Sequence, residues 1–432
     1  MKVRSEIDRM KSQQKRFFKL IKFKEALSRM EKAIPDKPLE NERIKSTRAL
    51  GRVLAEDIIA EKELPDHDFA AMDGYAVNTQ NIQNASENNP VKLNITGELY
   101  PPDHPTKASI GTFEAMYVAC GAPIPNGADV VIKVEFIRRE KGEIIIRKPV
   151  EKHRNIAQSG EDVKKNEIVL SKGHIMRAQD IGLLVALKQE FVNVIRKPKV
   201  AIISVGDELT EPFGISSNKT ANNNAYIIAS LVEYFNAEPI LLGIANDNIG
   251  HIEQMIKSGL DNADIVITIA GCSVGLKDYV PNVLGGLGKP GIIFHGVSIS
   301  AGKVSGVAVT QGKPIIMLPG HVGSTVATFY LFVIPLLNMQ LGLGFSDLLP
   351  KITCILDGKV TAKPTIDLVL PVKVHIQADK YHAVPLKKHL SILNNLVDAN
   401  GYVFIPAGVE KNKNDIIDVK IFGGLEFFNM MR

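Results

Sequence analysis

Apolar and polar positions follow different periods in different regions of the chain. Apolar residues recur at helical spacing over 22–34, which predicts an amphipathic helix. Pro35 and Pro38 follow and end it. Helical periodicity returns over 175–190, and a further short helix is predicted over Arg48–Ile59. These segments predict a helical domain whose parts are separated in the sequence.

The residues between those helical segments, from Leu64 to about Arg154, have a β texture. Short β-prone runs alternate there with turns rich in Pro, Gly and Asn. The runs are Val91–Thr96, Ala115–Ala119, Val130–Phe136 and Glu143–Arg147. We therefore expect a small β domain inserted into a discontinuous helical domain.

From residue 198 onward, apolar runs alternate with amphipathic stretches. The predicted strands are Val200–Val205, Pro239–Ile244, Asp264–Ile269, Ile292–Ile299, Val307–Thr310 and Ile315–Leu318. The predicted helices are Asn222–Phe235, Ile249–Leu260, Tyr279–Leu287 and Ser324–Leu341. Such alternation is typical of a doubly wound, mostly parallel sheet that helices cover on both faces. The tail returns to strand-like runs, which predicts a C-terminal β domain.

These patterns predict a multi-domain protein of the α/β plus β class. The expected divisions are a basic arm over 1–20, a discontinuous helical domain over 21–62 and 155–197, an inserted β domain over 63–154, an α/β domain over 198–345 and a C-terminal β domain over 346–432. A length of 432 residues suits such a division, and 45% hydrophobic and 23% charged residues is ordinary globular composition.

The net charge of +5 is concentrated at one end of the chain. Residues 1–24 hold nine Lys and Arg against Glu6 and Asp8, so they carry +7 and the remainder carries −2. The arm is interpreted as a solvated extension, or alternatively as an electrostatic tether to RNA, anionic lipid or an acidic protein. Because no aromatic-rich recognition motif accompanies it, we expect no specific nucleic-acid partner.

Cysteine usage and hydropathy bear on the compartment. Cys120, Cys272 and Cys354 are widely separated and form no CxxC motif, so we expect neither disulfides nor a structural zinc site. The N-terminus lacks the apolar region of a secretory signal. The apolar run Phe329–Leu337 is too short to span a bilayer. A cytoplasmic location without a membrane span is therefore expected.

Candidate chemistry gathers where the predicted strands of the α/β domain end. Ligands of open α/β sheets bind outside the carboxyl ends of the strands. The segments found there are Gly206-Asp207-Glu208, Asn246-Asp247, Gly271-Cys272-Ser273-Val274-Gly275 with Lys277 and Asp278, Ser300-Ala301-Gly302-Lys303, and Pro319-Gly320-His321-Val322-Gly323-Ser324. Their glycines would let backbone N–H groups approach an anion, helped by helix N-termini.

The carboxylates among these segments suggest a metal as well as an anion. Glu208, Asp247 and Asp278 suit Mg²⁺ or a polar heterocycle, and phosphate loops beside such groups suggest phosphoanhydride chemistry. Any single glycine there could serve only a turn. His295 and His321 are interpreted as local hydrogen-bonding residues. The chain contains no Walker A motif, and no GxGxxG follows the first strand.

A series of motifs along the chain resembles one known family. They are Leu64-Pro65 with Ala71-Met72-Asp73-Gly74-Tyr75-Ala76-Val77, Gly121-Ala122-Pro123-Ile124-Pro125 with Gly127-Ala128-Asp129, Gly160-Glu161-Asp162, Gly206-Asp207-Glu208-Leu209, Ser273-Val274-Gly275 with Asp278-Tyr279, Phe294-His295 and Leu318-Pro319-Gly320. In this order, from about residue 20 to the C-terminus, they resemble the MoeA family of molybdopterin molybdenumtransferases, which is related to the E domain of gephyrin.

The resemblance implies a transferase of molybdenum cofactor biosynthesis that uses Mg²⁺. Such enzymes take adenylated molybdopterin and molybdate (or tungstate), insert the metal into the dithiolene and release AMP. The resemblance also implies a homodimer with an inter-subunit cleft, to which the partner would contribute Asp73 and Asp162, and a molybdopterin adenylyltransferase as a possible partner protein.

The residues implied for this site fall into three groups. The catalytic group is Asp73, Asp162, Glu208, Asp247, Asp278 and Lys303, and the metal ligands within it are Glu208, Asp247 and Asp278. The substrate-binding group is Gly206, Asp207, Gly271, Ser273, Gly275, Gly302, Pro319, Gly320 and Ser324. Lys303 and Ser324 are the residues expected to contact phosphate or molybdate. For Asp73 and Asp162 alone, a turn or an exposed loop would be the alternative interpretation.

Several positions differ from the family's usual residues. They are Ala70, Cys120, Asn222–Asn224, Ala270, Ser300, Ala301, His321 and Val322. Serine in place of lysine at 300 removes a charge-assisted hydrogen bond of about 1.5–3 kcal/mol from the implied oxyanion site. Loss of proline at 301 and 322 loosens two loops. We interpret the chain as a divergent member that keeps an anionic-ligand cleft. The alternatives are an impaired molybdopterin-binding carrier or scaffold, and related chemistry on another nucleotide.

Overall fold

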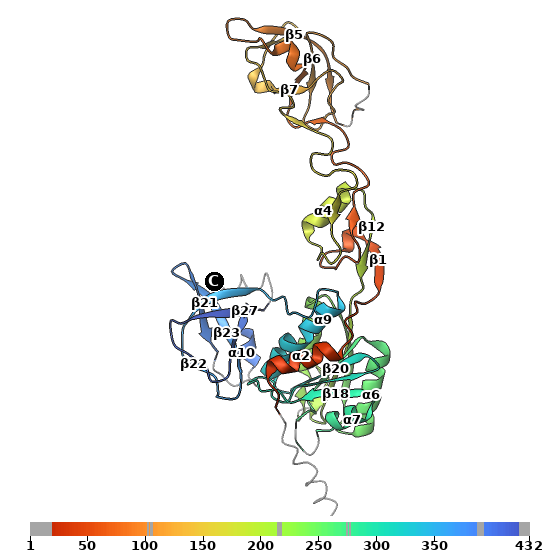
Figure 1. Cartoon of the computed structure of the whole chain (residues 1–432), viewed down its shortest axis with the longest axis vertical. Coiled ribbons are helices and arrows are strands. Elements are labelled where there is room, and N and C mark those ends of the chain that lie inside the picture. The colour runs from red at the N-terminus through yellow and green to blue at the C-terminus, as the bar shows by residue number, and fades with distance from the viewer. Residues whose placement is uncertain are drawn as a thin grey trace, which may run out of the picture. The chain divides into compact units, whose positions relative to one another are not determined.

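The protein is described by a computed structural model (Figure 1). It covers residues 20–101, 103, 107–213, 218–273, 275, 278–386 and 393–422. Nearly all of the predicted basic arm lies outside the described residues, as do Val274 and Lys277 of the third strand-end segment. The chain divides into two compact units: unit 2 spans Arg43–Val194, and unit 1 holds the parts before and after it.

Unit 1 is built on a six-stranded sheet with the order β16-β13-β17-β20-β19-β18. The strands are β13 (Lys199–Val205), β16 (Glu238–Ala245), β17 (Ile265–Ile269), β18 (Pro290–His295), β19 (Gly306–Thr310) and β20 (Lys313–Leu318). β16, β13, β17 and β20 run parallel, while β19 is antiparallel to both β20 and β18. The predicted mostly parallel sheet is therefore confirmed.

Helices cover both faces of this sheet (Figure 1). They are α2 (Phe23–Ala33), α5 (Asn223–Tyr234), α6 (Ile249–Asn262), α7 (Val280–Gly286), α8 (Val322–Thr328) and α9 (Ile334–Gln340). Along β13, Val200 and Ile202 join the core with α2, α5, α8 and α9, whereas Ala201 and Ile203 join the core with α6 and α7. This alternation follows from the two-residue period of a strand, and it makes the sheet doubly wound.

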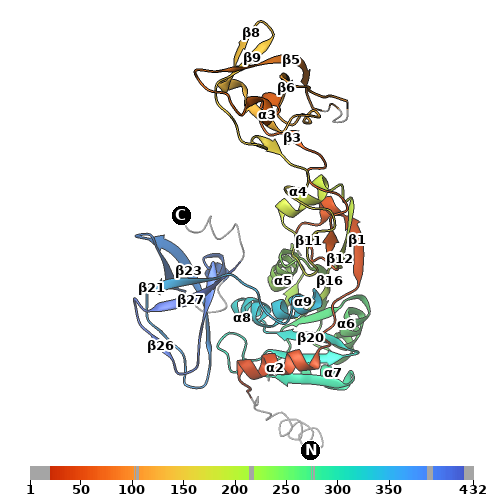
Figure 2. The ribbon, with the colours of Figure 1, turned by 45° about the horizontal axis from the view of Figure 1, so that its top comes forward.

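The C-terminal part of unit 1 forms a closed barrel, with the order β21-β24-β23-β25-β27 (Figure 2). Its strands are β21 (Lys351–Leu356), β23 (Leu368–Gln377), β24 (Lys380–Pro385), β25 (Gly401–Ile405) and β27 (Ile416–Ile421), with the short strands β22 (Val360–Thr361) and β26 (Glu410–Lys411) and helix α10 (Leu393–Val397). Its interior is a separate apolar cluster that includes Cys354, Val374 and Val419. The predicted C-terminal β domain is thus a barrel, which leaves its sheet no free edge.

Unit 2 contains a six-stranded mixed sheet with the order β7-β4-β6-β5-β9-β8. The strands are β4 (Gly74–Val77), β5 (Val91–Leu99), β6 (Glu114–Val118), β7 (Val130–Lys133), β8 (Arg138–Glu140) and β9 (Glu143–Ile146). Tyr75 and Ala76, neighbours on β4, belong to different apolar clusters, so this sheet is also buried on two faces. It is the inserted β domain that the sequence predicts.

The rest of unit 2 packs around α4 (Ala178–Ala186) and a third apolar cluster that includes Leu54, Met176 and Leu184. The remaining short elements of the chain are β1 (Asn41–Lys45), η1 (Ser46–Arg48), β2 (Ile58–Ile59), β3 (Phe69–Ala70), α3 (Thr79–Ile82), η2 (Val134–Phe136), β10 (Ile156–Ala157), β11 (Ile168–Leu170), β12 (Phe191–Ile195), β14 (Leu209–Thr210) and β15 (Thr220–Ala221).

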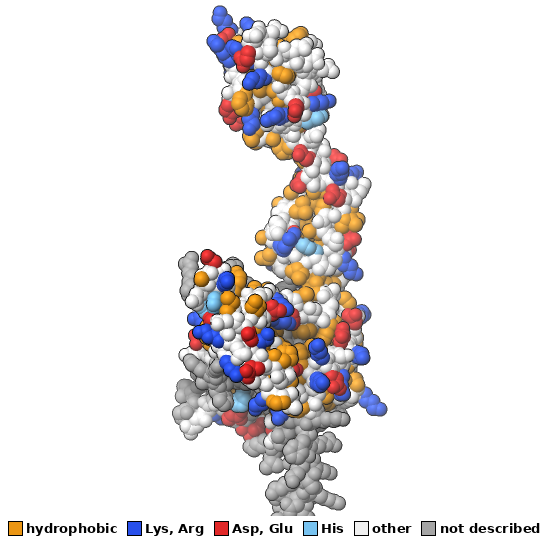
Figure 3. Space-filling view, turned by 60° about the vertical axis from the view of Figure 1, so that its left-hand side comes forward, with side chains coloured by type: hydrophobic (Ala, Val, Ile, Leu, Met, Phe, Trp, Pro, Cys, Tyr) orange, Lys and Arg blue, Asp and Glu red, His pale blue; other side chains and the backbone are white. Residues whose placement is uncertain are grey.

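Lys, Arg, Asp and Glu side chains are intermingled over the face that Figure 3 shows.

The predicted helix over Arg48–Ile59 is wrong. Only η1 is helical near it, and the following residues bond to a distant segment: Gly51 N–H donates to the Met176 carbonyl and Leu54 N–H to the His174 carbonyl. Gly51 also has φ +74°, outside the helical range. Tertiary pairing of the backbone has overridden the helical spacing of the apolar residues.

Three other elements differ from their predicted bounds. β7 ends at Lys133 because Val134–Phe136 forms the 3₁₀ turn η2. β18 ends at His295, where Gly296 takes φ +99°. The long final helix of the α/β domain is interrupted by a π-helical turn, η3 (Phe329–Val333), between α8 and α9. Periodicity alone does not reveal a one-residue insertion of this kind.

The expected domain boundaries stay a prediction. Helix α2 was expected in the discontinuous helical domain, but it packs on the unit 1 sheet. Ala26 and Met30 are fully buried in the apolar cluster of the unit 1 sheet, and the Phe23 and Phe332 rings lie 5.7 Å apart. The run Val322–Gln340 is long and apolar enough to cross a membrane, yet its most apolar window is 89% buried. It forms core contacts through Phe329 and Phe332.

Asp180 should contribute strongly to the stability of unit 2. The buried carboxylate accepts hydrogen bonds from the Arg177 side chain and N–H and contacts the His174 ring. The Arg177 side chain, more than any other group, holds the pKa of Asp180 far below its ordinary value. Asp180→Asn should lower the free energy of unfolding by about 2–3 kcal/mol at pH 7.

The pH dependence has a definite sign, measurable by urea unfolding. A carboxylate whose pKa is lower in the folded than in the unfolded state stabilises the fold at pH values above its unfolded pKa of about 4. The difference in free energy of unfolding between wild type and Asp180→Asn should therefore shrink as the pH falls below about 4. Glu190→Gln, an exposed change in the same unit, should stay within about 0.5 kcal/mol of wild type. An equal loss in both variants at every pH would contradict this role for Asp180.

Candidate functional site

The strand ends of unit 1 meet at one edge of its sheet. β16, β13, β17 and β20 are parallel, and β18 shares their direction because β19 is antiparallel to both of its neighbours. The segments that follow their last residues therefore emerge at the same edge. This topology brings together the strand-end residues that the sequence selects.

The segment after β13 folds back tightly over a glycine. Gly206 N–H donates to the Ala245 carbonyl (3.0 Å), and Gly206 takes φ +152°. A Cβ built at this position would lie 2.5 Å from both carboxylate oxygens of Glu208. The Glu208 carboxylate therefore lies close to residue 206, where the backbone conformation favours glycine.

The ends of β13 and β16 are linked through an aspartate. Asp247 N–H donates to Asp207 Oδ1 (3.2 Å), so one carboxylate orients the loop that carries the other. Asn248 then caps α6 by accepting from His251 N–H (3.1 Å). Asp207 was predicted to bind substrate, and its observed contact gives it a role in ordering this loop.

The segment after β17 carries two successive residues in the left-handed region. Ala270 has φ +68° and Gly271 has φ +64°. A Cβ at Gly271 would lie 2.8 Å from Val205 Cγ1, so only glycine fits there. Alanine at 270 adopts a conformation that costs a residue with a Cβ roughly 1–2 kcal/mol. Ala270, one of the positions that differ from the family's usual residues, is therefore strained.

Asp278 closes the loop that follows. Its Oδ2 accepts from Gly275 N–H (2.6 Å), while Asp278 N–H donates to the Gly275 carbonyl (3.3 Å). Burial raises the pKa of the neighbouring Cys272 thiol to about 12, so this thiol is unreactive at neutral pH. Burial also lowers the pKa of His295, whose Nε2 lies 2.7 Å from the Cys272 carbonyl. This local contact agrees with the interpretation of His295 as a hydrogen-bonding residue.

Ser300 has a structural role that the sequence did not reveal. Its Oγ accepts from Val369 N–H (2.9 Å) and lies 3.3 Å from the Val369 carbonyl, while Ser300 N–H donates to the Asp367 carbonyl (2.8 Å). Serine at 300 therefore ties the strand-end segment to the start of β23. Ala301 and Gly302 are buried, and a Cβ at Gly302 would clash with Thr328. Lys303 is exposed and carries the positive charge of this segment.

The segment after β20 is held by hydroxyl and amide side chains. Thr325 Oγ1 donates to the Pro319 carbonyl (2.5 Å), and Asn224 Nδ2 donates to the Gly320 carbonyl (2.7 Å). His321 is the N-cap residue of α8. Ser324 is 6% exposed, in the first turn of this helix. Asn224 comes from the first turn of α5 and belongs to one of the altered motifs of the sequence. Its link between two segments was not predicted.

Asp73 and Asp162 belong to unit 2, whereas the strand ends described above belong to unit 1. Asp73 immediately precedes β4, and its Oδ1 accepts from Cys120 N–H (2.8 Å). A side chain at Gly74 would clash with the Ile132 carbonyl. Asp162 is exposed, and its N–H donates to the Leu64 carbonyl (3.0 Å). Both are thus held by the backbone of well-defined turns.

The carboxylates do not form a metal cage by themselves. Within the described residues, no group of three or more His, Cys, Asp or Glu side chains could hold a metal ion. Mg²⁺ usually keeps several waters and binds through one or two carboxylates plus substrate phosphates. The magnesium ligands Glu208, Asp247 and Asp278 therefore stay a prediction.

Three family models match the chain. Residues 21–187 match the MoeA N-terminal region (domains I and II), residues 201–339 a probable molybdopterin binding domain, and residues 353–422 the MoeA C-terminal region (domain IV). Together they cover the inserted β domain, the strand-edge site of unit 1 and the barrel. The motifs that indicated this family in the sequence lie within the matched regions.

Curated relatives and solved structures agree with these matches. A molybdopterin molybdenumtransferase of Staphylococcus aureus is 32% identical over 296 residues, which is 68% of this chain and 70% of that protein. A molybdopterin molybdenumtransferase of Staphylococcus epidermidis is 31% identical over 323 residues, which is 74% of this chain and 76% of that protein. The crystal structure of a molybdopterin biosynthesis MoeA protein from Pyrococcus horikoshii is 31% identical with a TM-score of 0.81, covering 94% of this chain and all of that one.

Replacing Ala270 with glycine should stabilise unit 1. Glycine adopts the left-handed conformation without the steric cost that alanine bears, so Ala270→Gly should raise the free energy of unfolding by about 1 kcal/mol in urea. The matched control is Ala221→Gly in the extended strand β15, which should lower it by about 0.5–1 kcal/mol. Losses of equal size in the two variants would show that residue 270 is unstrained.

Proposed function

The chain belongs to the MoeA family, and from that premise we propose that its strand-edge site inserts molybdate or tungstate into adenylated molybdopterin and releases AMP. The family makes it a molybdopterin molybdenumtransferase that processes a molybdopterin substrate in molybdenum cofactor biosynthesis. The observation that carries the finer proposal is the convergence of glycine-rich turns and carboxylates at one edge of the unit 1 sheet.

Phosphate recognition is assigned to the backbone and Lys303. The turns at Gly271 and Gly320 would let peptide N–H groups approach the pyrophosphate of the substrate. The N–H groups of Gly206 and Gly275 already bond to the Ala245 carbonyl and to Asp278, so these glycines would shape the turns. Lys303 is exposed at the same edge and would supply a full positive charge. Release of AMP breaks a phosphoanhydride bond, so charge on the phosphoryl oxygens must be neutralised as the bond breaks.

The carboxylates are assigned to magnesium and to orientation of the substrate. When bound, Mg²⁺ would neutralise phosphate charge and polarise the scissile bond. Glu208, Asp247 and Asp278 are its proposed ligands together with substrate phosphate. The bond from Gly275 to Asp278 supports this assignment, because it holds that carboxylate in a defined place before substrate arrives, and the Glu208 carboxylate lies close to Gly206.

The oxyanion is assigned to the segments around Lys303 and Ser324. Ser300 stands where the family usually has lysine, and its hydroxyl is hydrogen-bonded to the β23 backbone. Lys303 is therefore the cation of this segment. A weaker hold on molybdate or tungstate than in relatives with two lysines is therefore expected. Ser324 in the first turn of α8 is the proposed hydroxyl contact.

A homodimer is proposed to complete the cleft. Asp73 and Asp162 belong to unit 2, whereas the other candidate carboxylates belong to unit 1. A second copy of the chain would contribute its Asp73 and Asp162 to the strand-edge site. We propose that this dimer acts in the cytoplasm, where Cys120, Cys272 and Cys354 stay reduced, and that a molybdopterin adenylyltransferase supplies its substrate.

Release of AMP tests the assigned reaction. Purified protein with adenylated molybdopterin, Mg²⁺ and molybdate should release AMP, and Asp278→Ala should lower kcat by about 100-fold or more, since a group acting on the transition state is lost. Asp261→Ala, an exposed change on α6, is the matched control and should leave the rate unchanged. Equal AMP release by wild type and Asp278→Ala would refute the proposal, whereas substrate binding without turnover would indicate a carrier.

Mixing two inactive variants tests the inter-subunit cleft. Asp73→Ala and Asp278→Ala homodimers should each be inactive. After subunit exchange, half of the dimers should be heterodimers with one intact cleft, which restores about a quarter of wild-type AMP release. Exchange is followed by differential tagging of the two chains. If heterodimers form but AMP release stays at the level of the separate variants, the two aspartates do not act across the interface.

A further inference from the structure

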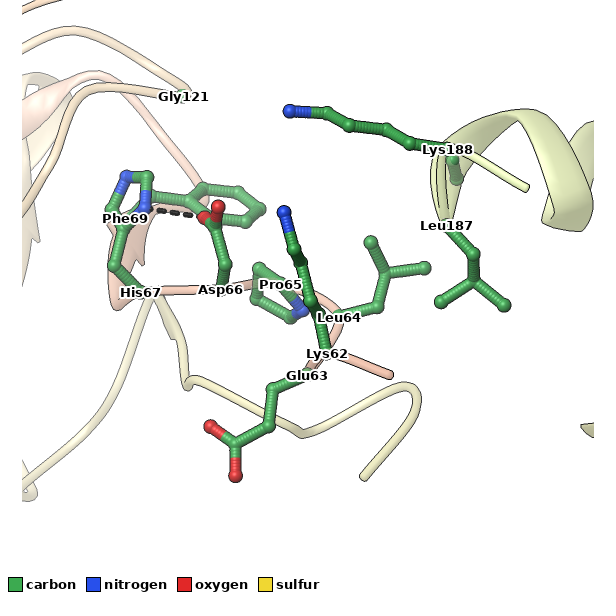
Figure 4. Close-up of a pocket in the computed structure, with 11 residues that line it drawn as sticks. Lys62, Glu63, Leu64, Pro65, Asp66, His67, Phe69, Gly121, Leu187 and Lys188 are labelled. Carbon is green, nitrogen blue, oxygen red and sulfur yellow. Dashed lines mark hydrogen bonds and ion pairs between the residues drawn. The ribbon is translucent and has the colours of Figure 1, made fainter. Parts of the chain in front are cut away.

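Unit 2 contains a pocket of about 370 Å³ that the proposed reaction does not use. It lies between the segment Lys62–Phe69 and the C-terminal end of α4, with Gly121 at its border (Figure 4). Neither Asp73 nor Asp162 lines it. Its volume falls within the range of sites that hold a small organic molecule.

One side of the pocket is apolar. Leu64, Pro65 and Phe69 line it from one segment, and Ala186 and Leu187 line it from the end of α4. The Phe69 ring is half-buried and lies on the side of the pocket opposite Leu187 (Figure 4). A flat apolar group could therefore pack against the Phe69 ring and be enclosed by aliphatic side chains.

Two ammonium groups enter the same pocket from two different elements. The Lys62 and Lys188 side chains both extend into it (Figure 4), and neither forms an ion pair with a described residue. The nearby acids are otherwise engaged: Asp66 Oδ1 lies 2.6 Å from His67 Nδ1, and Glu63 accepts from Ser159 Oγ (2.8 Å). The Glu63 carboxylate points away from the two ammonium groups (Figure 4), so the two ammonium groups face the pocket with Asp66, which contacts His67, as the nearest lining carboxylate.

The end of α4 does not cancel this charge. A helix C-terminus is negative because its last carbonyl groups lack partners. Here the carbonyls of Leu183, Leu184 and Val185 accept hydrogen bonds from the N–H groups of residues 187–189. These three carbonyl oxygens are therefore already engaged within the helix end.

We propose that this pocket binds a phosphate monoester with a planar apolar group. The phosphate carries about −1.5 to −2 charges at pH 7, which matches two lysines better than a single carboxylate does. Its oxygens bind Lys62 and Lys188, while the planar group packs against Phe69. Its lining residues differ from those assigned to the strand-edge site, so the assignment goes beyond the proposed function.

Calorimetry with phenyl phosphate, the simplest such molecule, tests the assignment. Wild-type full-length protein should bind it in unit 2 with an affinity that falls as NaCl is added. Inorganic phosphate lacks the ring and benzoate lacks the second charge, so each should bind at least about tenfold more weakly. The double variant Lys62→Ala/Lys188→Ala should lose about tenfold or more in affinity for phenyl phosphate.

The matched control is Lys165→Ala/Lys172→Ala, which removes the same charge from exposed positions of unit 2 outside the pocket. It should bind phenyl phosphate as wild type does, and circular dichroism should show that both double variants are folded. No binding by wild type at millimolar ligand, equal binding by the pocket variant, or an equal loss in the control would overturn the proposal. Benzoate that binds as tightly as phenyl phosphate would overturn the assignment to a phosphate.

Discussion

Burial of both faces of the unit 1 sheet is the constraint on which the proposed site depends. Neighbouring residues of β13 point into different apolar clusters, and helices cover each of them. A parallel sheet enclosed in this way has no polar face, so a charged substrate can meet it only at an edge. The edge where β13, β16, β17, β18 and β20 end is where the glycines and carboxylates lie.

At that edge the backbone approaches itself closely, and side chains hold the segments in place. Gly206 lies against the Glu208 carboxylate, and Gly271 against Val205. Asn224 and Ser300 tie the segments to neighbouring elements through backbone groups. Their bonds fix the positions of loops that would face substrate. The proposed site is thus shaped mainly by backbone geometry, and Asp207 and Asp278 accept hydrogen bonds from backbone N–H groups within it.

Predictions from periodicity succeeded where an element buries a continuous apolar face. The strands of the unit 1 sheet and helices α5, α6 and α7 lie within one or two residues of their expected bounds, apart from β18. The prediction over Arg48–Ile59 was wrong because its apolar residues pack through backbone pairing with the His174–Met176 segment. Helical spacing of apolar residues describes which side chains are buried, and it does not decide which backbone partner the segment finds.

The sequence by itself determined the family, the order of the domains and which residue types stand at each strand end, because these depend on local periods and on motifs that survive in the chain. Tertiary structure alone decided what several residues do. Ser300 binds β23, 69 residues away, and Ala270 is held in a left-handed conformation by the packing around it. Contacts between distant segments set these roles, and no local pattern records which distant backbone group a side chain will meet.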